Sequence, residues 1–284
     1  MFKKLLGLAP KQELDGSFSP SKLALKLAVP KKTNYTKVRY PHYEGARKKV
    51  LVICTEQKNM TMQNGKNFST GNHPVELILP MLHLAEAGFE FTIATPTGKA
   101  AILEMWAMPS SDEHVLQFYK QYKSQFEAPI SLTQFIQSHM NDDDYVAVFI
   151  PGGHGVMLGI PEDKAVGQVL HWAHQKDLFT ITLCHGPGAL LSTQLENKTF
   201  IYQGYKMAVF PDSMDAKTPM IGYLPGPMPW KPEQQLSELG AQMVNTKADD
   251  TTCIDRKLIT GASPLASNQL GILAVESILK TLNQ

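Results

Sequence analysis

The sequence has few cysteines and no closely spaced pair of them. Cys54, Cys184 and Cys253 are the only three in 284 residues, and no C-x-x-C spacing occurs. An odd and sparse set argues against a disulfide framework and favours a reducing compartment. We therefore expect a cytoplasmic protein in which Cys54 and Cys253 are structural residues.

Long apolar runs and a surplus of one charge are also missing. No stretch reaches the length that a bilayer-spanning helix needs, and the apolar start over residues 1–10 is too short for a secretory signal. Lys and Arg number 27 against 26 Asp and Glu, which gives a formal net charge of +1. A nucleic-acid binder would carry a basic face or stripe. We expect neither a membrane nor a nucleic acid as a partner.

Apolar segments of strand length alternate with segments of helical character. Such alternation is typical of βαβ units and predicts an α/β fold with a doubly wound, mostly parallel sheet. A buried strand is clearest at residues 49–54, whereas the polar residues 56–71 are expected to form a loop. Further strands are expected at 89–94, 145–150, 179–183 and 205–210, a hairpin near 246–254 and 257–260, and helices at about 74–87 (capped by Asn72), 162–176 and 264–282.

Two segments depart from this alternation. Residues 1–45 are rich in Lys and Pro and are expected to form an arm or small domain that wraps the core. Residues 96–141 are expected to form an insertion with amphipathic helices near 113–125 and 132–139. We expect the arm and the insertion to pack together as a smaller companion domain, beside a core of residues 46–284.

The main chemical signal is Leu183-Cys-His-Gly-Pro-Gly188, in which Cys184 follows a predicted strand and precedes a helix start. Ligands of doubly wound sheets bind beyond the carboxyl ends of the strands. The glycines permit a sharp turn that exposes the sulfur, and the positive end of the following helix is expected to lower the pKa of the thiol. His185 is either a general base for this cysteine or a structural histidine.

Two further features lie at the same edge of the predicted sheet. Pro151-Gly-Gly-His-Gly155 follows a strand, and its backbone N–H groups are suited to an oxyanion hole. His154 in this loop, like His114, is expected to be a surface or loop histidine without a role. Glu76 lies in the first turn of a helix, where a carboxylate either favours the helix dipole or points at the thiol and moves a proton.

Six motifs, taken in chain order, resemble the HchA-type heat-shock proteins, a family of the PfpI-like superfamily with a flavodoxin-like α/β fold. The resemblance extends from about residue 40 to the C-terminus. The motifs are Asn72-His-Pro-Val-Glu76, Ala87-Gly-Phe-Glu90, Trp106-Ala-Met-Pro109, Pro151-Gly-Gly-His-Gly155, Leu183-Cys-His-Gly-Pro187 and Phe210-Pro-Asp212.

The resemblance implies the residues of the site and their roles. Cys184 is the nucleophile, His185 lies beside it, and Asp215 orients the histidine, with Asp212 as the second candidate. Trp106 is expected to be a packing residue, and its place in a family motif makes the lining of the pocket the alternative. Glu76 supplies a carboxyl that contacts the sulfur of Cys184. Gly152 and Gly153 supply backbone N–H donors near the sulfur.

The activity that the resemblance implies is that of a glutathione-independent glyoxalase (glyoxalase III), which turns methylglyoxal into lactate through a hemithioacetal on Cys184. Glyoxal as a second substrate, deglycation of early adducts on proteins or nucleotides, and a stress-related holdase activity toward unfolded proteins are related expectations. A homodimer is expected on the same ground.

The sequence departs from the family at its metal site, which uses two histidines and a glutamate. The glutamate matches Glu90, but the histidines align with Ala85 and Tyr122. His83 and Glu86 lie close in sequence without occupying the matching positions. One carboxylate cannot form a zinc site with three protein ligands, so we expect no metal and no other cofactor.

Three alternative interpretations compete with the glyoxalase. The same nucleophile, histidine and acid would serve a cysteine peptidase or amidase. A glutamine-amidotransferase-like domain is disfavoured because no histidine follows His185. A chaperone without catalysis would use an adaptable apolar surface, for which the candidates are Met214, Met220 and Met228.

Overall fold

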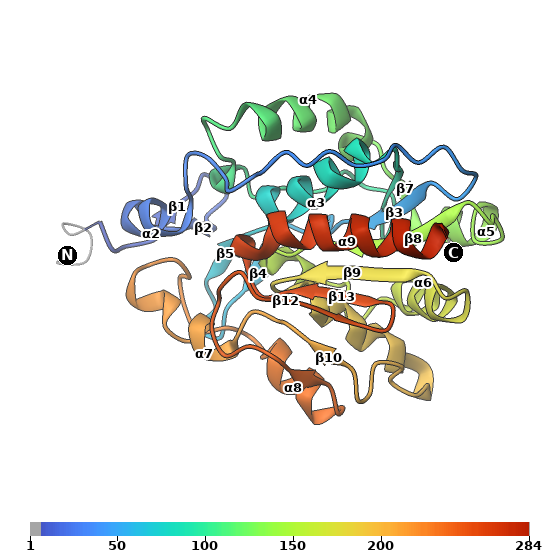
Figure 1. The fold of residues 1–284 in the computed structure, drawn as a ribbon. Coiled ribbons are helices and arrows are strands. Elements are labelled where there is room, and N and C mark those ends of the chain that lie inside the picture. Colours follow the sequence, from blue (N-terminus) through green and yellow to red (C-terminus); the bar gives the residue numbers. More distant parts are fainter. Residues whose placement is uncertain (1–6, 284) are drawn as a thin grey trace.

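Seven strands form the central sheet of the computed structural model, which describes residues 7–283 (Figure 1). Their order is β12-β13-β9-β8-β3-β6-β7, and the neighbours are parallel except for β12 with β13. The expected α/β class with a mostly parallel sheet is confirmed. The strands are β3 (Lys49–Ile53), β6 (Glu90–Thr95), β7 (Ile130–Ser131), β8 (Tyr145–Ile150), β9 (Phe179–Leu183), β12 (Thr252–Asp255) and β13 (Leu258–Gly261).

Both faces of this sheet are covered, which explains why its strands read as continuous apolar runs. Side chains alternate between the faces, so that Leu51 and Ile53 belong to one core cluster and Val50 and Val52 to the other. The helices of the second cluster are α3 (Pro74–Glu86), α4 (Glu113–Glu127) and α9 (Ser267–Leu282), and those of the first are α5 (Leu132–Ser138), α6 (Lys164–Gln175) and the 3₁₀ segment η3 (Gly186–Asn197).

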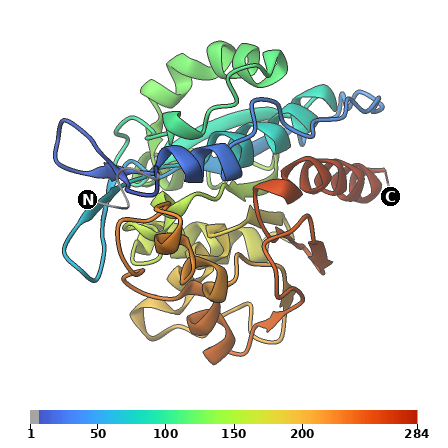
Figure 2. The same cartoon turned by 90° about the vertical axis from the view of Figure 1, so that its left-hand side faces the viewer.

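The N-terminal arm builds a second sheet with the segment that we expected to be a loop. The order is β1-β2-β5-β4, and residues 56–71 contribute the hairpin of β4 and β5 (Figure 2). The loop prediction is wrong because the hairpin is completed by β2, which pairs with β5 and lies far away in the sequence. Residues 1–6, the front of the apolar start, lie outside the described residues. The elements are β1 (Lys11–Gln12), β2 (Phe18–Ser19), α2 (Lys22–Ala28), β4 (Asn59–Thr61) and β5 (Asn67–Ser69).

The insertion contacts both the core and the arm. β7 extends the edge of the central sheet beside β6, α4 packs on α3, and α5 packs on α6. The backbone N–H and the hydroxyl of Thr33 in the arm both donate to Asp112 Oδ2 in the insertion, at 2.9 and 2.6 Å. The division of the chain into an arm, an insertion and a core of residues 46–284 stays a prediction.

Two local expectations need correction. The strand expected at 205–210 is reduced to β10 (Lys206–Met207), which pairs with β11 (Gln242–Met243) outside the central sheet. The residue before α3 is His73, whereas the Asn72 side chain binds both backbone groups of Thr55 and so holds the end of β3.

No helix in residues 7–283 is long and apolar enough to cross a bilayer. The remaining short elements are η1 (Met105–Ala107), η2 (His154–Met157), α7 (Asp212–Asp215), η4 (Thr218–Met220), α8 (Pro232–Glu238) and η5 (Pro264–Ala266).

Candidate active site

Cys184 lies on a sharp turn between β9 and η3. Its backbone φ is +59°, a left-handed conformation that costs a residue with a side chain roughly 1–3 kcal/mol and is common at functional turns. The turn is held from both sides, because Cys184 N donates to Gly261 O at 2.8 Å and Cys184 O accepts from Phe210 N at 2.9 Å. The sharp turn that the glycines predicted is therefore present, although Cys184 itself adopts the strained conformation.

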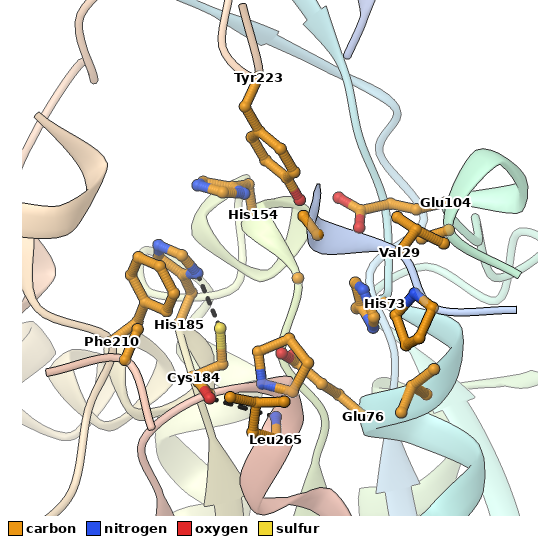
Figure 3. Close-up of a pocket in the computed structure, with 18 of the residues that line it drawn as sticks. Val29, His73, Glu76, Glu104, His154, Cys184, His185, Phe210, Tyr223 and Leu265 are labelled. Atoms are coloured by element: carbon orange, nitrogen blue, oxygen red, sulfur yellow. Dashed lines mark hydrogen bonds between the residues drawn. The ribbon is translucent and has the colours of Figure 1, made fainter. Parts of the chain in front are cut away.

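The imidazole of His185 turns back toward the cysteine (Figure 3). Its Nδ1 lies 3.3 Å from Cys184 Sγ, and its Nε2 lies 2.7 Å from Asp215 Oδ2. Phe210 stacks on the ring, with the two centroids 4.8 Å apart. Side chains adjacent in sequence usually point apart, and here the strained turn brings the thiol and the imidazole into contact.

The structure distinguishes the two aspartates that the sequence left open. Asp212 accepts the backbone N–H groups of Glu233 and Gln234, at 3.3 and 2.9 Å, at the start of α8. A carboxylate in this place satisfies the free donors of a helix start. Asp215 is buried and is the aspartate that contacts His185.

A second histidine shares the carboxylate of Asp215. His154 Nε2 lies 3.0 Å from Asp215 Oδ1, and its ring centroid is 4.0 Å from that of His185. Burial opposes the ionisation of Asp215, but the two imidazoles outweigh it and hold the pKa of this carboxyl below its usual range. The expectation of a surface or loop histidine is wrong for His154, which is buried, and holds for the exposed His114. The sequence feature that could have indicated a role for His154 is its position after a strand, at the same edge of the sheet as Cys184.

Glu76 faces the cysteine from α3 (Figure 3). It is completely buried, and neither carboxyl oxygen has a hydrogen-bond partner of ordinary geometry within the described residues. Burial and, to a smaller extent, the neighbouring Glu104 raise the pKa of Glu76 well above its usual range. A side chain at Gly152 would strike both Glu76 Oε2 and Cys184. Glycine at this position therefore lets the carboxyl and the thiol approach each other.

The thiol of Cys184 is neutral in these surroundings. Burial raises the pKa of the thiol well above its ordinary value, and the Glu76 carboxyl raises it further. The expected lowering by a helix N-terminus is therefore wrong, since loss of water around a buried sulfur outweighs the effect of the 3₁₀ segment that follows. A neutral thiol needs a base before it can attack, and His185 Nδ1 is in position to be that base.

The cysteine opens into a cavity of about 500 Å³ (Figure 3). Its mouth is apolar and includes Leu27 and Leu265, which are 66% and 56% exposed. Two opposite sides of the cavity carry its chemistry. We call one the cysteine wall, formed by His154, Cys184, His185, Phe210 and Asp215, and the other the carboxyl wall, formed by His73, Glu76 and Glu104.

The N-terminal arm covers part of this cavity. Residues 27–30 and 32–34 line it, and Asn34 Nδ2 donates to Leu265 O at 3.1 Å, which ties the arm to the start of the C-terminal helix region. Trp106 packs against the core, as expected, and the alternative that it lines the pocket is wrong, because it is not among the lining residues. Its Nε1 donates to Ser69 O at 3.1 Å. The residues of its segment that line the cavity are Glu104 and Ala107.

Two groups of the carboxyl wall had no role in the sequence analysis. Glu104 Oε1 accepts from the Thr70 hydroxyl at 2.5 Å, whereas its Oε2 has no partner among the described residues. Burial raises the pKa of Glu104 to about 7. Burial lowers the pKa of His73 to about 3. Its Nδ1 likewise has no hydrogen-bond partner among the described residues. His73 lies in the motif Asn72-His-Pro-Val-Glu76, whereas no local sequence pattern marks Glu104.

The cysteine wall also contains the residues that could hold a metal ion. His154, His185 and Asp215 each offer one ligand atom, and these atoms lie within 4.8 Å of one another. Hydrogen bonds to Asp215 already use Nε2 of both histidines. The geometry is therefore that of one carboxylate that orients two imidazoles.

The positions that match the family's metal site have a different donor set. Glu90 pairs with Lys48 at 2.7 Å, and Ala85 and Tyr122 line the same surface pocket. Alanine has no ligand atom and lysine brings a positive charge, so these residues do not fit a tetrahedral zinc site. The absence of a specific zinc ion stays a prediction, which metal analysis of the purified protein would test.

Proteins of known name resemble this chain over most of its length. The pattern of the DJ-1/PfpI family matches residues 48–212. The "Protein/nucleic acid deglycase HchA" of Pseudomonas aeruginosa is 45% identical over 268 residues, which cover 93% of this chain and 92% of that relative. Its counterpart of the same name from Staphylococcus aureus is 44% identical over 276 residues, with coverage of 96% and 94%.

Solved structures share the fold at lower identity. Glyoxalase III from Candida albicans superposes with a TM-score of 0.63 and 20% identity, over 82% of this chain and 98% of that one. The Rapid Encystment Protein of Francisella tularensis superposes with a TM-score of 0.68 and 20% identity, over 81% and 99%. At this identity the likeness is one of fold alone.

Proposed function

The chain belongs to the DJ-1/PfpI family, and from this premise we propose that it is a glutathione-independent glyoxalase whose nucleophile is Cys184. The observation that carries the proposal is the chain of contacts from Cys184 through His185 to Asp215. The substrates are small dicarbonyls, methylglyoxal and glyoxal. Removal of early glycation adducts from proteins or nucleotides is the related activity, in keeping with the names of the curated relatives.

The first step is addition of the thiol to the aldehyde of methylglyoxal. His185 Nδ1, at 3.3 Å from the sulfur, takes the thiol proton as the C–S bond forms. For this, His185 presents an unprotonated Nδ1 and donates its Nε2–H to Asp215, which fixes the tautomer. The oxyanion of the hemithioacetal is stabilised by the backbone N–H groups of Gly152 and Gly153. It then takes the thiol proton from His185, which leaves Nδ1 unprotonated again.

The second step moves a proton from carbon to carbon. A base removes the proton of the former aldehyde carbon, and the resulting enediolate is protonated at the neighbouring carbon, which leaves a thioester of lactate on Cys184. Both His185 and Glu76 face this position (Figure 3), and the burial of Glu76 keeps its carboxyl able to hold a proton near neutral pH. Water then hydrolyses the thioester to lactate and the free thiol. The overall reaction is methylglyoxal plus water to lactate, without any cofactor.

Lactate formation from methylglyoxal tests this proposal. The assay uses purified protein without glutathione in an amine-free buffer, and compares the wild type with Cys184→Ala. We expect lactate from the wild type and a loss of more than about 10³-fold in the variant. Cys253→Ala is the matched control, because Cys253 lies on β12 away from the cavity. Full turnover by Cys184→Ala would contradict the proposal.

The cysteine peptidase or amidase stays an alternative outcome of the same experiment. If the wild type forms no lactate but cleaves peptide or amide substrates in a Cys184-dependent manner, the nucleophile serves acyl transfer. The arm residues 27–30 narrow the mouth of the cavity and favour small or single-side-chain substrates over an extended peptide.

The chaperone activity finds less support in the methionines that were proposed for it. Met220 is 64% exposed, but Met228 is buried in the core. A holdase therefore stays a prediction, and suppression of aggregation that survives Cys184→Ala would support it. We also keep the cytoplasm as the proposed compartment, since the three cysteines are free thiols, and a homodimer as the proposed assembly, which sedimentation velocity would test.

A further inference from the structure

Glu104 is a buried acid inside the cavity that the proposed reaction does not use. Its segment is fixed beside α3 by a hydrogen bond from Glu104 N to Asn72 O at 3.0 Å. Thr70 holds one carboxyl oxygen, and Oε2 has no partner among the described residues. Figure 3 shows the carboxyl directed toward the space between Tyr223 and Val29. Since folded proteins pair the great majority of buried acceptors, this orientation calls for a functional reason.

The surroundings allow Glu104 to both hold and release a proton. Burial raises its pKa to about 7, while the His154 imidazole, the Thr70 hydroxyl and nearby backbone N–H groups act in the opposite direction. Glu76 faces it from α3, and Tyr223 faces it from the segment after η4. At neutral pH a substantial share of the molecules therefore carries a proton on this carboxyl.

The cavity is larger than methylglyoxal requires. A volume of about 500 Å³ falls within the range of roughly 300–1,000 Å³ found for pockets of drug-sized ligands, whereas methylglyoxal has only three carbons and two oxygens. The exposed apolar mouth at Leu27 and Leu265 suits the methylene chain of an amino-acid side chain. An adduct on such a side chain can enter with its reacting carbon toward Cys184.

We propose that Glu104 is the general acid for substrates in which the dicarbonyl is bound to nitrogen. The inference rests on the proposed function, because it uses the same nucleophile. Its substrate class is the hemiaminal that methylglyoxal forms with a primary amine. An amine nitrogen cannot leave as an anion and needs a proton as its bond to carbon breaks, whereas free methylglyoxal has no such leaving group.

The step balances with groups that line the cavity. The Cys184 sulfur bonds to the carbon that carries the hydroxyl and the nitrogen, and the C–N bond breaks with its electron pair on nitrogen. The thiol proton passes to His185 Nδ1, and the proton of the Glu104 carboxyl passes to the nitrogen, so that a neutral amine departs. The product is the hemithioacetal that methylglyoxal forms directly, and exchange with solvent returns a proton to Glu104.

Two adducts that differ in one leaving atom test this role. The substrates are the methylglyoxal adducts of Nα-acetyllysine and of N-acetylcysteine, which are linked through nitrogen and sulfur respectively. A thiol has an ordinary pKa near 8.5 against about 10.4 for the lysine amine, so the sulfur leaves as a thiolate without an acid. The spontaneous dissociation rate of each adduct is measured without enzyme in an excess of an aldehyde trap. This rate is subtracted from the rate with enzyme.

The proteins are the wild type, Glu104→Gln, Glu104→Asp and the surface control Glu127→Gln, which removes an exposed carboxylate on α4. We expect Glu104→Gln to lower kcat/KM by about 10²-fold for the nitrogen adduct and by only a few-fold for the sulfur adduct. Wild-type turnover of the nitrogen adduct is expected to fall above about pH 7 relative to the sulfur adduct, and Glu104→Asp is expected to keep part of this pH dependence. Thermal unfolding confirms that each variant is folded.

An equal loss for both adducts in Glu104→Gln, with an unchanged pH profile, would overturn the proposal and leave Glu104 a structural role. Wild-type protein that converts methylglyoxal and the sulfur adduct, but cleaves the nitrogen adduct no faster than it dissociates, would overturn it while the glyoxalase stands. Failure of the proposed function is distinct, because the wild type then forms no lactate from methylglyoxal itself, and the role of Glu104 falls with it.

Discussion

The two walls of the cavity differ in how their buried polar groups are paired. On the cysteine wall, His185 and His154 both hydrogen-bond to Asp215, at 2.7 and 3.0 Å. On the carboxyl wall, Glu76 and Glu104 are buried as deeply, yet three of their four carboxyl oxygens have no partner in the described structure. Folded proteins pair the great majority of such atoms. The cysteine wall is thus organised before a substrate arrives, whereas the carboxyl wall leaves its groups free to act on one.

The ionisation of the two walls differs in the same way. The pKa of Asp215 lies below its usual range, whereas the pKa values of Glu76 and Glu104 lie above it. All three carboxyls are buried, so burial alone does not decide the charge. Two imidazoles next to Asp215 stabilise its ionised form. No such partner offsets burial at Glu76 and Glu104, and Glu104 raises the pKa of Glu76 further.

The largest effect is expected from breaking the pairing of the cysteine wall. Asp215→Asn removes the carboxylate that orients His185, and we expect lactate formation to fall by about 10³-fold or more, as in comparable triads. Asp212→Asn is the matched control, because Asp212 caps α8 and its loss should cost only about 1 kcal/mol of stability. Steady-state kinetics and thermal unfolding measure both. Equal losses of activity would mean that the two aspartates are wrongly distinguished.

Glu76→Gln removes the acid–base group of the carboxyl wall that faces the thiol. We expect a loss of about 10²-fold in turnover of methylglyoxal, since the carbon-to-carbon proton transfer loses one of its two candidate bases. Deuterium exchange at the carbon of the hemithioacetal, followed by NMR, locates the impaired step. Unchanged turnover would assign the proton transfer to His185 alone.

His154→Asn tests whether the second histidine positions Asp215. We expect a loss of roughly 10-fold in kcat with little change in KM, because a positioning residue acts on the catalytic carboxylate and not on the substrate. The pH profile of kcat/KM should shift, since one of the two imidazoles that stabilise the Asp215 charge is gone. His154→Gln, whose amide can still donate to Asp215, should restore part of the activity. A loss of activity that only parallels a fall in the melting temperature would indicate that His154 has a packing role.

Stability, unlike the catalytic rates, is expected to respond to pH in opposite senses for the two walls. The raised pKa of Glu104, about 7 against an ordinary 4.5, stabilises the fold fully below about pH 4.5, and this contribution is lost as the pH rises through 7. The lowered pKa of Asp215 stabilises the fold above about pH 4, and this contribution is lost in acid. Glu104→Gln should therefore gain stability relative to the wild type between pH 5 and pH 8, by up to about 3 kcal/mol. Urea unfolding at both pH values measures this, and a difference independent of pH would contradict it.

Much of the fold follows from local patterns. The run Tyr145–Ile150 is buried in every position, and the sharp turn expected after Leu183 is present at Cys184, whose role as the nucleophile stays a proposal. The hairpin of β4 and β5 was missed because its strands have three residues each, too few to show alternation. The pKa of Cys184 was predicted in the wrong direction, because the effect of the local helix was considered, whereas the burial of the thiol and the Glu76 carboxyl, distant in sequence, were not.

By itself, the sequence determined the class of the fold, the family and the sharp turn at Cys184, because each depends on residues that are neighbours in the chain. Only the tertiary structure decided that Asp215 and not Asp212 orients His185, that His154 shares this carboxylate, and that Glu104 faces the cavity. Asp215 lies 30 residues from His185 and 61 from His154, on elements that meet only at the carboxyl edge of the folded sheet. The charge of a buried group depends on such neighbours in space, and no local pattern specifies them.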